Sequence, residues 1–283
     1  MKIVVDRPLI LVTNDDGIQS GGLRAAAEIA APLGDLLIVA PEAQQTGMGR
    51  SFPRADGQGV IETRSGPLGG GTILYHAVRG SPAQAVAHAV LEIASRPLAF
   101  CISGINNGEN LGATNLISGT VGAALEAAAY GIPALAVSIG PEAPELFARP
   151  YCHEDWAVAA SVIRQFAAAA LRHGLPPRVA LLNINIPSFA TLGTEVRFTA
   201  QSRQNHYLCT RPGPRDLSKP FRLPIAEAID VAALEPDSDI FAFVVDKVVS
   251  VTPMGQDLTA RDTHGQMLEY HPPGVAFPNI RYH

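Results

Sequence analysis

The chain has 283 residues, of which 47% are hydrophobic and 17% are charged, and its formal net charge is −5. This composition is that of a soluble globular protein with one large or two modest domains. The chain has no surplus of basic residues, which argues against a protein that binds a DNA or RNA backbone.

In the first half of the chain, short apolar runs alternate with segments of helical periodicity. The runs have the length and composition of parallel strands covered on both faces, and they span residues 8–14, 35–41, 98–104 and 132–138. The helical segments lie between them, at residues 21–33, 81–94 and 120–131. Ser81 and Pro82 suit the N-cap and the first turn of the second helix. The alternation predicts an α/β fold with a doubly wound sheet.

The rest of the chain adds further strands and changes character after residue 188. We expect strands at 60–64 and 72–78, separated by a glycine-rich turn at 66–71, and a helix at 154–174 that leads into a strand at 178–187. Strand-like pieces at 196–201 and 240–254 are joined by a polar, proline-rich stretch at 203–226. This stretch predicts an extended arm or hairpin that serves oligomer contacts.

These patterns divide residues 1–259 into a core of about residues 8–190 and a C-terminal β extension of about residues 191–259. The tail, residues 260–283, is rich in proline and polar residues and is expected to be poorly ordered.

No targeting segment and no membrane span is expected. Asp6, Arg7 and Pro8 interrupt the first apolar stretch, which argues against a signal peptide. The longest apolar region, residues 119–139, contains Glu126 and a helix-ending Gly-Ile-Pro step, so we interpret it as a helix followed by a buried strand. The three cysteines have unrelated spacings and predict free thiols in a reducing cytoplasm: Cys101, Cys152 and Cys209.

Polar, glycine-containing loops follow three of the predicted strands. The sequence NDDG (14–17) follows the first, QQTGMGRS (44–51) lies after the second, and SGINNGENLG (103–112) followed by SGT (118–120) lies after the strand at 98–104. Ligands of open α/β sheets bind beyond the carboxyl ends of the strands. The three loops are therefore expected to converge at one edge of the sheet.

Asp15 and Asp16 form an adjacent acidic pair at the end of a buried strand. Oxygen ligands suit Mg²⁺ or Mn²⁺, and the charge of such a cation offsets the repulsion between the two carboxylates. Asn106 and a hydroxyl from Thr46 or Ser51 can complete the shell. The alternative is that the pair forms only a turn and a helix N-cap.

The loops at 103–112 and 118–120 offer groups that suit a phosphorylated ligand. Three glycines let the backbone approach a ligand closely, and Asn106, Asn107 and Asn110 supply neutral oxygen and amide groups. Ser118 and Thr120 lie at a predicted helix start, where free N–H groups and the helix dipole favour phosphate. The alternatives are a surface loop without a ligand and simple capping of the helix.

Other common catalytic patterns are absent from the sequence. It contains no HExxH zinc motif, no GxSxG nucleophile elbow and no GxxxxGK[ST] phosphate loop. A G-x-G-x-x-G dinucleotide motif does not follow the first strand, because Gly17 is followed by IQSGG. We expect three of the histidines to be packed or surface residues rather than metal ligands: His76, His88 and His206.

Taken together, these motifs resemble the SurE (survival protein E) family over residues 8 to 259. The matching stretches are NDDGI, AP followed by TG-x-GRS, SGINNGENLG, SGTVGAALEA, LLNINIP and SVTPMGQDLTA. Members of this family are metal-dependent phosphatases of nucleoside 5′- and 3′-monophosphates. The resemblance implies a single domain over residues 1–259 with a Rossmann-like, mostly parallel sheet. It also implies that the C-terminal β extension is exchanged within a homodimer, which often pairs into a homotetramer.

The resemblance also implies a role for individual residues. One divalent metal ion per subunit is held by four residues, Asp15, Asp16, Thr46 and Asn106, and four others surround the phosphate: Asn110, Ser118, Gly119 and Thr120. Thr46 stands where the family commonly has serine, and Gln84 stands where an acidic residue is common. About seven additional N-terminal residues and the segment after residue 259 also depart from the usual pattern.

The sequence therefore predicts a 5′-nucleotidase or acid-phosphatase type hydrolase. A metal-activated water, or one activated by Asp15 or Asp16 as a base, attacks the phosphorus in line. One alternative is an aspartyl-phosphate mechanism, which the adjacency of the pair disfavours because those enzymes space their aspartates D-x-D. The other is a non-catalytic nucleotide or metal sensor on the same scaffold.

Overall fold

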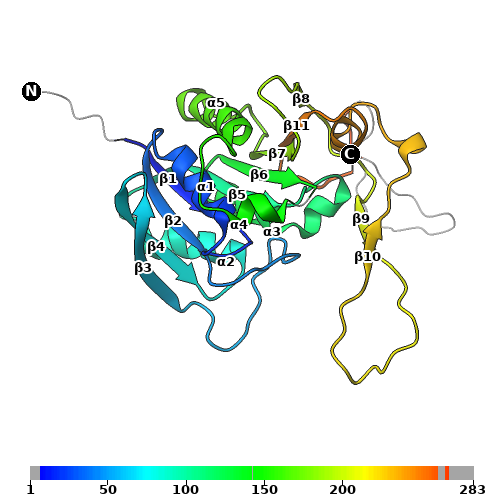
Figure 1. Cartoon of the computed structure of the whole chain (residues 1–283), viewed down its shortest axis with the longest axis horizontal. Helices are drawn as coiled ribbons and strands as arrows, with labels where there is room; N and C mark the ends of the chain where they lie inside the picture. The colour runs from blue at the N-terminus through cyan, green and yellow to red at the C-terminus, as the bar shows by residue number, and fades with distance from the viewer. Residues whose placement is uncertain (1–6, 142, 261–264, 268–283) are drawn as a thin grey trace, which may run out of the picture.

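A nine-stranded mixed sheet with helices on both faces forms the body of the molecule (Figure 1). The structure is a computed structural model and describes residues 7–141, 143–260 and 265–267. The predicted α/β fold with a mostly parallel sheet is confirmed. The N-terminal residues 1–6 and most of the predicted tail lie outside the described residues.

The strand order of the sheet is β3-β4-β2-β1-β5-β6-β7-β11-β8. Six strands form its parallel centre: β1 (Leu9–Thr13), β2 (Asp35–Pro41), β4 (Gly71–Val78), β5 (Leu98–Asn107), β6 (Ala134–Gly140) and β7 (Leu181–Pro187). At the margins, β3 (Ile61–Leu68) and β11 (Val249–Met254) pair antiparallel with β4 and β7, and β8 (Val196–Phe198) runs parallel to β11. The chain winds outward from β1 in one direction through β2 and β4 and in the other through β5 and β6. The topological switch point, where such sheets bind ligands, therefore lies between β1 and β5.

Two pairs of helices cover the two faces of the parallel centre. The helices α1 (Gly21–Ala30) and α5 (Ala157–His173) pack on one face, and α2 (Pro82–His88) and α3 (Gly119–Ala129) pack on the other. Ser81 is the N-cap of α2, as predicted, and Gln84 completes a reciprocal capping box with it. Short helical segments make up the rest of the helices: η1 (Ala89–Ile93), η2 (Ala113–Ile117), α4 (Pro144–Ala148), η3 (Val231–Ala233) and η4 (Phe241–Val245). Within the described residues, no helix is long and apolar enough to cross a membrane.

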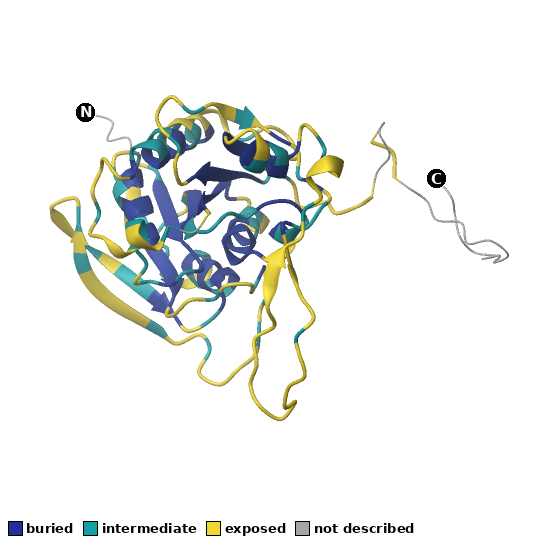
Figure 2. Ribbon diagram, turned by 45° about the vertical axis from the view of Figure 1, so that its right-hand side comes forward, coloured by how far each residue is buried: buried dark blue, intermediate teal, exposed yellow. Residues whose placement is uncertain are grey.

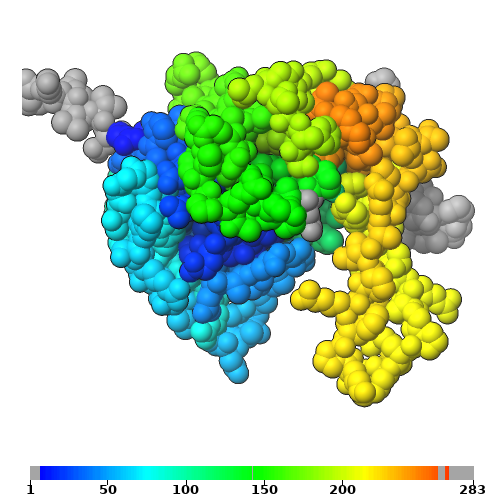
Figure 3. All heavy atoms as spheres, viewed as in Figure 1, coloured from blue at the N-terminus to red at the C-terminus, as the bar shows by residue number. Residues whose placement is uncertain are grey.

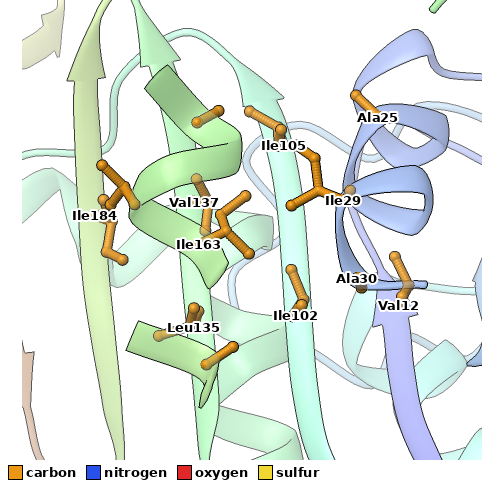
Figure 4. Packing of buried hydrophobic residues seen from close by; sticks show 14 of the residues in the cluster. Val12, Ala25, Ile29, Ala30, Ile102, Ile105, Leu135, Val137, Ile163 and Ile184 are labelled. Atoms are coloured by element: carbon orange, nitrogen blue, oxygen red, sulfur yellow. The ribbon is translucent and has the colours of Figure 1, made fainter. Parts of the chain in front are cut away.

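The central strands are buried on both faces. Ile10 and Val12 of β1 join the apolar cluster under α1 and α5, whereas Leu11 faces the cluster under α2 and α3. Figure 4 shows how Ile29 of α1 and Ile163 of α5 project onto the side chains of the strands. The core in Figure 2 accordingly follows the parallel strands and the inner sides of these helices. Such burial explains why the strands are nearly continuous apolar runs.

The largest differences from the expected boundaries concern β5, the β3–β4 turn and the run 240–254. Strand β5 continues to Asn107, so the first part of the expected 103–112 loop is strand. Strands β3 and β4 meet at the two-residue turn Gly69-Gly70, whose φ angles are +56° and +80°, so residues 66–68 are paired and do not form the turn. The apolar run 240–254 divides into η4 and β11 because Ile240 and Phe243 pack with Leu111 in a separate apolar cluster. A short apolar run does not by itself distinguish helix from strand.

The expected hairpin in the C-terminal part is present. Strands β9 (Tyr207–Cys209) and β10 (Ile225–Glu227) pair antiparallel and form a second, two-stranded sheet. The hairpin projects from the body, and nearly all of its residues are exposed (Figure 2). Its exposed apolar side chains include Leu208, Leu217, Phe221 and Ile225. Its predicted role in oligomer contacts stays a prediction.

We predict that Leu135→Ala in β6 destabilises the protein by about 2–5 kcal/mol, because it removes a fully buried side chain from the core and leaves a cavity. Leu192→Ala is the matched control: Leu192 is 72% exposed, and its truncation should change stability by no more than about 0.5 kcal/mol. Urea-induced unfolding measures both. Equal midpoints for the two variants would contradict the assignment of the core.

Candidate functional site

The turn after β1 is fixed by a buried asparagine. The side-chain amide of Asn14 donates to the carbonyl of Gly17 at 3.2 Å and to the hydroxyl of Ser20 at 2.9 Å, and its oxygen accepts the N–H of Gly17 at 3.2 Å. Gly17 has a φ of +97°, a conformation that residues with a Cβ atom rarely adopt. The turn therefore holds the two residues between Asn14 and Gly17 at the switch point.

Asp15 is buried against the first turn of α3. Its side-chain oxygen Oδ1 accepts a hydrogen bond from the hydroxyl of Thr120 at 2.5 Å. A Cβ atom on Gly119 would lie 2.6 Å from the Cβ of Asp15, so only glycine permits this approach. Burial raises the pKa of Asp15 to about 7; the Thr120 hydroxyl acts in the opposite direction, and repulsion from Asp16 adds to the increase.

Asp16 is less buried and faces two other segments. Its Oδ2 accepts the backbone N–H of Asn107 at 3.2 Å, and the side-chain amide of Gln44 lies 3.5 Å from its Oδ1. The carboxylate thus lies between the end of β5 and the loop after β2, and the predicted convergence of the loops holds at this point.

Asn106 and Asn107 have different partners at the end of β5. The side-chain amide of Asn106 donates to the carbonyl of Gly108 at 2.7 Å, and its side-chain oxygen accepts no hydrogen bond from the described residues. The side-chain oxygen of Asn107 accepts the N–H of Ala143 at 2.8 Å and ties β5 to the segment before α4. Asn106 therefore has an oxygen available for a ligand, and Asn107 has a structural contact.

Asn110 is held by residues that sequence reasoning did not single out. Its N–H donates to the side-chain oxygen of Asn185 at 2.7 Å, and its carbonyl accepts the side-chain amides of Asn183 and Asn185, each at 2.9 Å. Its own side-chain amide donates to the hydroxyl of Ser138 at 2.8 Å. The available signal was two asparagines at alternate positions in the otherwise apolar strand β7, which places both on one face of the sheet.

The start of α3 shows the helix capping that one interpretation of the SGT sequence predicts. The hydroxyl of Ser118 accepts the N–H of Val121 at 3.1 Å and therefore caps the helix. The hydroxyl of Thr120 is bonded to Asp15, and its expected contact with phosphate stays a prediction. The N-terminal end of α3 lies beside the two aspartates in either case.

The loop after β2 reaches the site through its backbone. The N–H of Gln45 donates to the carbonyl of Asp15 at 2.7 Å, but Thr46 is exposed and its hydroxyl makes no hydrogen bond with the described residues. The hydroxyl of Ser51 is buried and also has no partner in the described part of the chain. Further along, Arg50 pairs with the buried Glu126 at 2.6 Å and fastens the loop to α3.

The oxygens at this edge fit a hard divalent cation. Two carboxylates and the side-chain oxygen of Asn106 come from adjacent strands, and the described residues contain no cluster of three or more histidine, cysteine or acidic side chains that would suit zinc. Carboxylate and neutral oxygen donors are the set that Mg²⁺ and Mn²⁺ prefer. A buried acid with a raised pKa is also a group whose charge a cation would stabilise.

Comparisons with known proteins agree with these motifs. A family model described as "Survival protein SurE" matches residues 10–207. The 5′-nucleotidase SurE of Thermococcus gammatolerans is 36% identical over 252 residues, covering 89% of this chain and 91% of that protein. The protein of the same name from Methanosarcina acetivorans is 36% identical over 269 residues, covering 93% of this chain and 97% of that protein. Among solved structures, the SurE protein from Aquifex aeolicus superimposes with a TM-score of 0.67 at 28% identity, covering 89% of this chain and 95% of that one.

Without divalent cations, we predict that the stability difference between Asp15→Asn and the unchanged protein depends on pH. The pKa of Asp15 is raised from its ordinary value of 3.8 to about 7, so the folded protein favours the protonated form. The stabilisation that protonated Asp15 contributes is fully present below the pKa of this group in the unfolded chain, and it is lost as the pH rises through about 7. Asp15→Asn should therefore gain stability over the unchanged protein as the pH rises, and the gain should level off once the pH has passed through this value.

Thermal unfolding in EDTA across this pH range measures the difference. Asp56→Asn is the matched control, since Asp56 is an exposed carboxylate in a loop and makes no ion pair with the described residues. A stability difference for Asp15→Asn that stays constant with pH would contradict the burial argument.

Proposed function

The chain belongs to the survival protein SurE family, and on this basis we propose that it is a metal-dependent phosphatase of nucleoside monophosphates. The chain matches nearly the whole length of relatives that are named 5′-nucleotidase SurE. It is accordingly a hydrolase of the nucleotidase type. The observation that carries the proposal is the contact between Asp15 and the first turn of α3. It brings a carboxylate pair for a cation next to a helix N-terminus that suits a phosphate.

The residues proposed to hold the metal are Asp15, Asp16 and Asn106, with Thr46 as a further hydroxyl ligand from the loop after β2. One Mg²⁺ or Mn²⁺ ion per subunit fits this set. When bound, the cation supplies positive charge that stabilises the phosphoryl transition state and lowers the pKa of a water molecule. Thr46 directly follows Gln45, whose N–H donates to the carbonyl of Asp15, and this contact supports Thr46 as the ligand from this loop.

The phosphate is proposed to lie at the start of α3. We assign to this position the amide of Gly119, the hydroxyl groups of Ser118 and Thr120 and the side chain of Asn110. The dipole of α3, an eleven-residue helix, adds positive potential at its first turn. Asn110 suits this role because Asn183, Asn185 and Ser138 fix its backbone and its side chain.

The two aspartates are proposed to have different roles in proton transfer. The Thr120 hydroxyl holds Asp15 in one orientation, which suits a fixed position beside the ion. Asp16 is less buried and faces the loop side, where a water molecule can approach it. We therefore assign to Asp16 the acceptance of the proton from the attacking water.

The assembly and location follow the family resemblance as proposals. The exposed β9–β10 hairpin carries apolar side chains away from the body and suits exchange within a homodimer or homotetramer. The three cysteines are free thiols, which favours the reducing cytoplasm.

We predict that Asp16→Asn lowers kcat for AMP by at least about 100-fold while the fold stays intact, because the amide neither accepts the proton nor offsets the charge of the cation. Asp56→Asn, in an exposed loop, is the matched control and should keep near-normal activity. Steady-state phosphate release gives the rates, and circular dichroism checks the fold. Near-normal activity of Asp16→Asn would remove this residue from the reaction.

A second prediction concerns the metal and the substrate class. EDTA should abolish phosphate release from AMP, GMP and their 3′ isomers, and Mg²⁺ or Mn²⁺ should restore it. Acid quenching with radiolabelled substrate should trap no phosphoenzyme, because water attacks directly. A trapped phosphoaspartate would favour the covalent mechanism, and no release from any nucleotide with any metal would favour a nucleotide sensor.

A further inference from the structure

A cavity of about 450 Å³ lies beside the candidate site, on the face of the sheet that α1 covers. Its wall begins with Ile18 and Gln19, directly after the aspartate turn, and continues into the first turn of α1. Residues of β3 and β4 form the opposite side, and the end of α4 with residues 148–150 closes the third. In Figure 3, dark blue atoms from the start of the chain lie recessed between the cyan and green segments.

The cavity is lined by positive charge. Three arginines face it, from α1, β3 and the segment after α4: Arg24, Arg64 and Arg149. No aspartate or glutamate is among the described residues that line it. Arg64 shares its guanidinium with Glu62, whereas the guanidinium groups of Arg24 and Arg149 have no carboxylate partner among the described residues.

Glu28 is an acid on α1, one turn after Arg24, that does not line the cavity. Its carboxylate accepts the N–H of Gly69 at 3.0 Å, at the turn between β3 and β4, and keeps its negative charge. Counted against the three arginines, Glu28 and the Arg64 partner Glu62 leave an excess of one positive charge among these described residues.

The backbone brings these arginines together through a close contact. A Cβ atom on Gly21 would lie 2.1 Å from the carbonyl oxygen of Phe147, so glycine at this position lets the α4 segment touch the first turn of α1. Trp156 packs edge-on against Phe147, with 5.1 Å between the two ring centroids, and so fixes Phe147 in place. This packing places Arg149 on the same cavity as Arg24.

The remaining lining suits an organic phosphate. The rings of Tyr75 and Phe147 and the apolar side chains of Ile18 and Pro67 supply surface for a ring or a sugar. Guanidinium groups bind phosphate through paired, charge-assisted hydrogen bonds. A volume of this size lies within the range of small-molecule sites.

We propose that this cavity is a second anion site, which binds a phosphate group other than the one that is cleaved. The phosphate belongs either to the far end of the same substrate or to a separate phosphorylated molecule. Anion binding in the cavity does not depend on the activity of the neighbouring site, because the cavity lining contains neither aspartate. The same-substrate source rests on the proposed function.

Binding of ADP to metal-free protein tests the site directly. The background variant is Asp16→Asn in EDTA, so that neither metal nor turnover contributes. Isothermal titration calorimetry should detect ADP binding, and the added changes Arg24→Gln and Arg149→Gln should weaken it about tenfold or more. Arg172→Gln with Arg211→Gln is the matched control: it removes the same charge from exposed positions outside the cavity and should leave the affinity unchanged.

Two kinetic arms in the metal-loaded protein without the Asp16 change separate the sources of the phosphate. If it belongs to the same substrate, Arg24→Gln with Arg149→Gln lowers kcat/KM for a nucleoside 3′,5′-bisphosphate about tenfold and leaves p-nitrophenyl phosphate unaffected. If it belongs to another molecule, ADP changes turnover of p-nitrophenyl phosphate more in the unchanged protein than in this variant.

No binding at millimolar ADP, or equal affinity with and without the two arginines, would overturn the site. Loss of hydrolysis in the unchanged protein would instead overturn the proposed function and leave the calorimetric result intact.

Discussion

The burial of Asp15 between the end of β1 and the start of α3 is the contact on which the rest of the site depends. A carboxylate that is 4% exposed loses most of its hydration, and an uncompensated charge there would destabilise the fold. Thr120 compensates with a hydroxyl at 2.5 Å, and the positive end of α3 points at the same group. Gly119 permits the approach because a side chain would overlap Asp15. Three residues from two distant parts of the chain are therefore one structural unit.

On the opposite side of the site, neutral side chains fix a site residue in place. Asn183 and Asn185 are fully buried in β7, where a polar side chain that makes no hydrogen bond destabilises the fold. Both donate to the carbonyl of Asn110, and Asn185 also accepts its N–H. Side chains in the interior of the sheet thus fix the position of a loop residue. The residues of the loop itself do not provide these contacts.

The C-terminal extension also supports the site and is more than an arm. The buried carboxylate of Asp239 accepts the N–H of Gly112 at 2.9 Å and that of Ser202 at 2.9 Å. The hydroxyl of Thr114 accepts the N–H of His206 at 2.9 Å. His206 itself is buried beside Glu109, in agreement with the expectation of a packed histidine. The base of the extension therefore braces the loop that carries Asn110, while the hairpin beyond it stays exposed.

The sequence by itself determined the alternation of strands and helices, and with it the edge of the sheet where Asp15, Asp16 and Asn106 gather. Continuous apolar runs and caps such as Ser81 depend on neighbours in the chain, so local pattern reveals them. The tertiary structure decided which partners complete the site. The Thr120 hydroxyl on Asp15, the asparagines of β7 around Asn110 and the arginines that share a cavity beside α1 come from segments distant in sequence. It also divided residues 240–254 into helix and strand, because the packing of Ile240 and Phe243 outweighed the local preference of the run. Such contacts depend on the order of the strands in the sheet and on the distances between backbone segments. The local periodicity of the sequence reveals neither the order nor the distances.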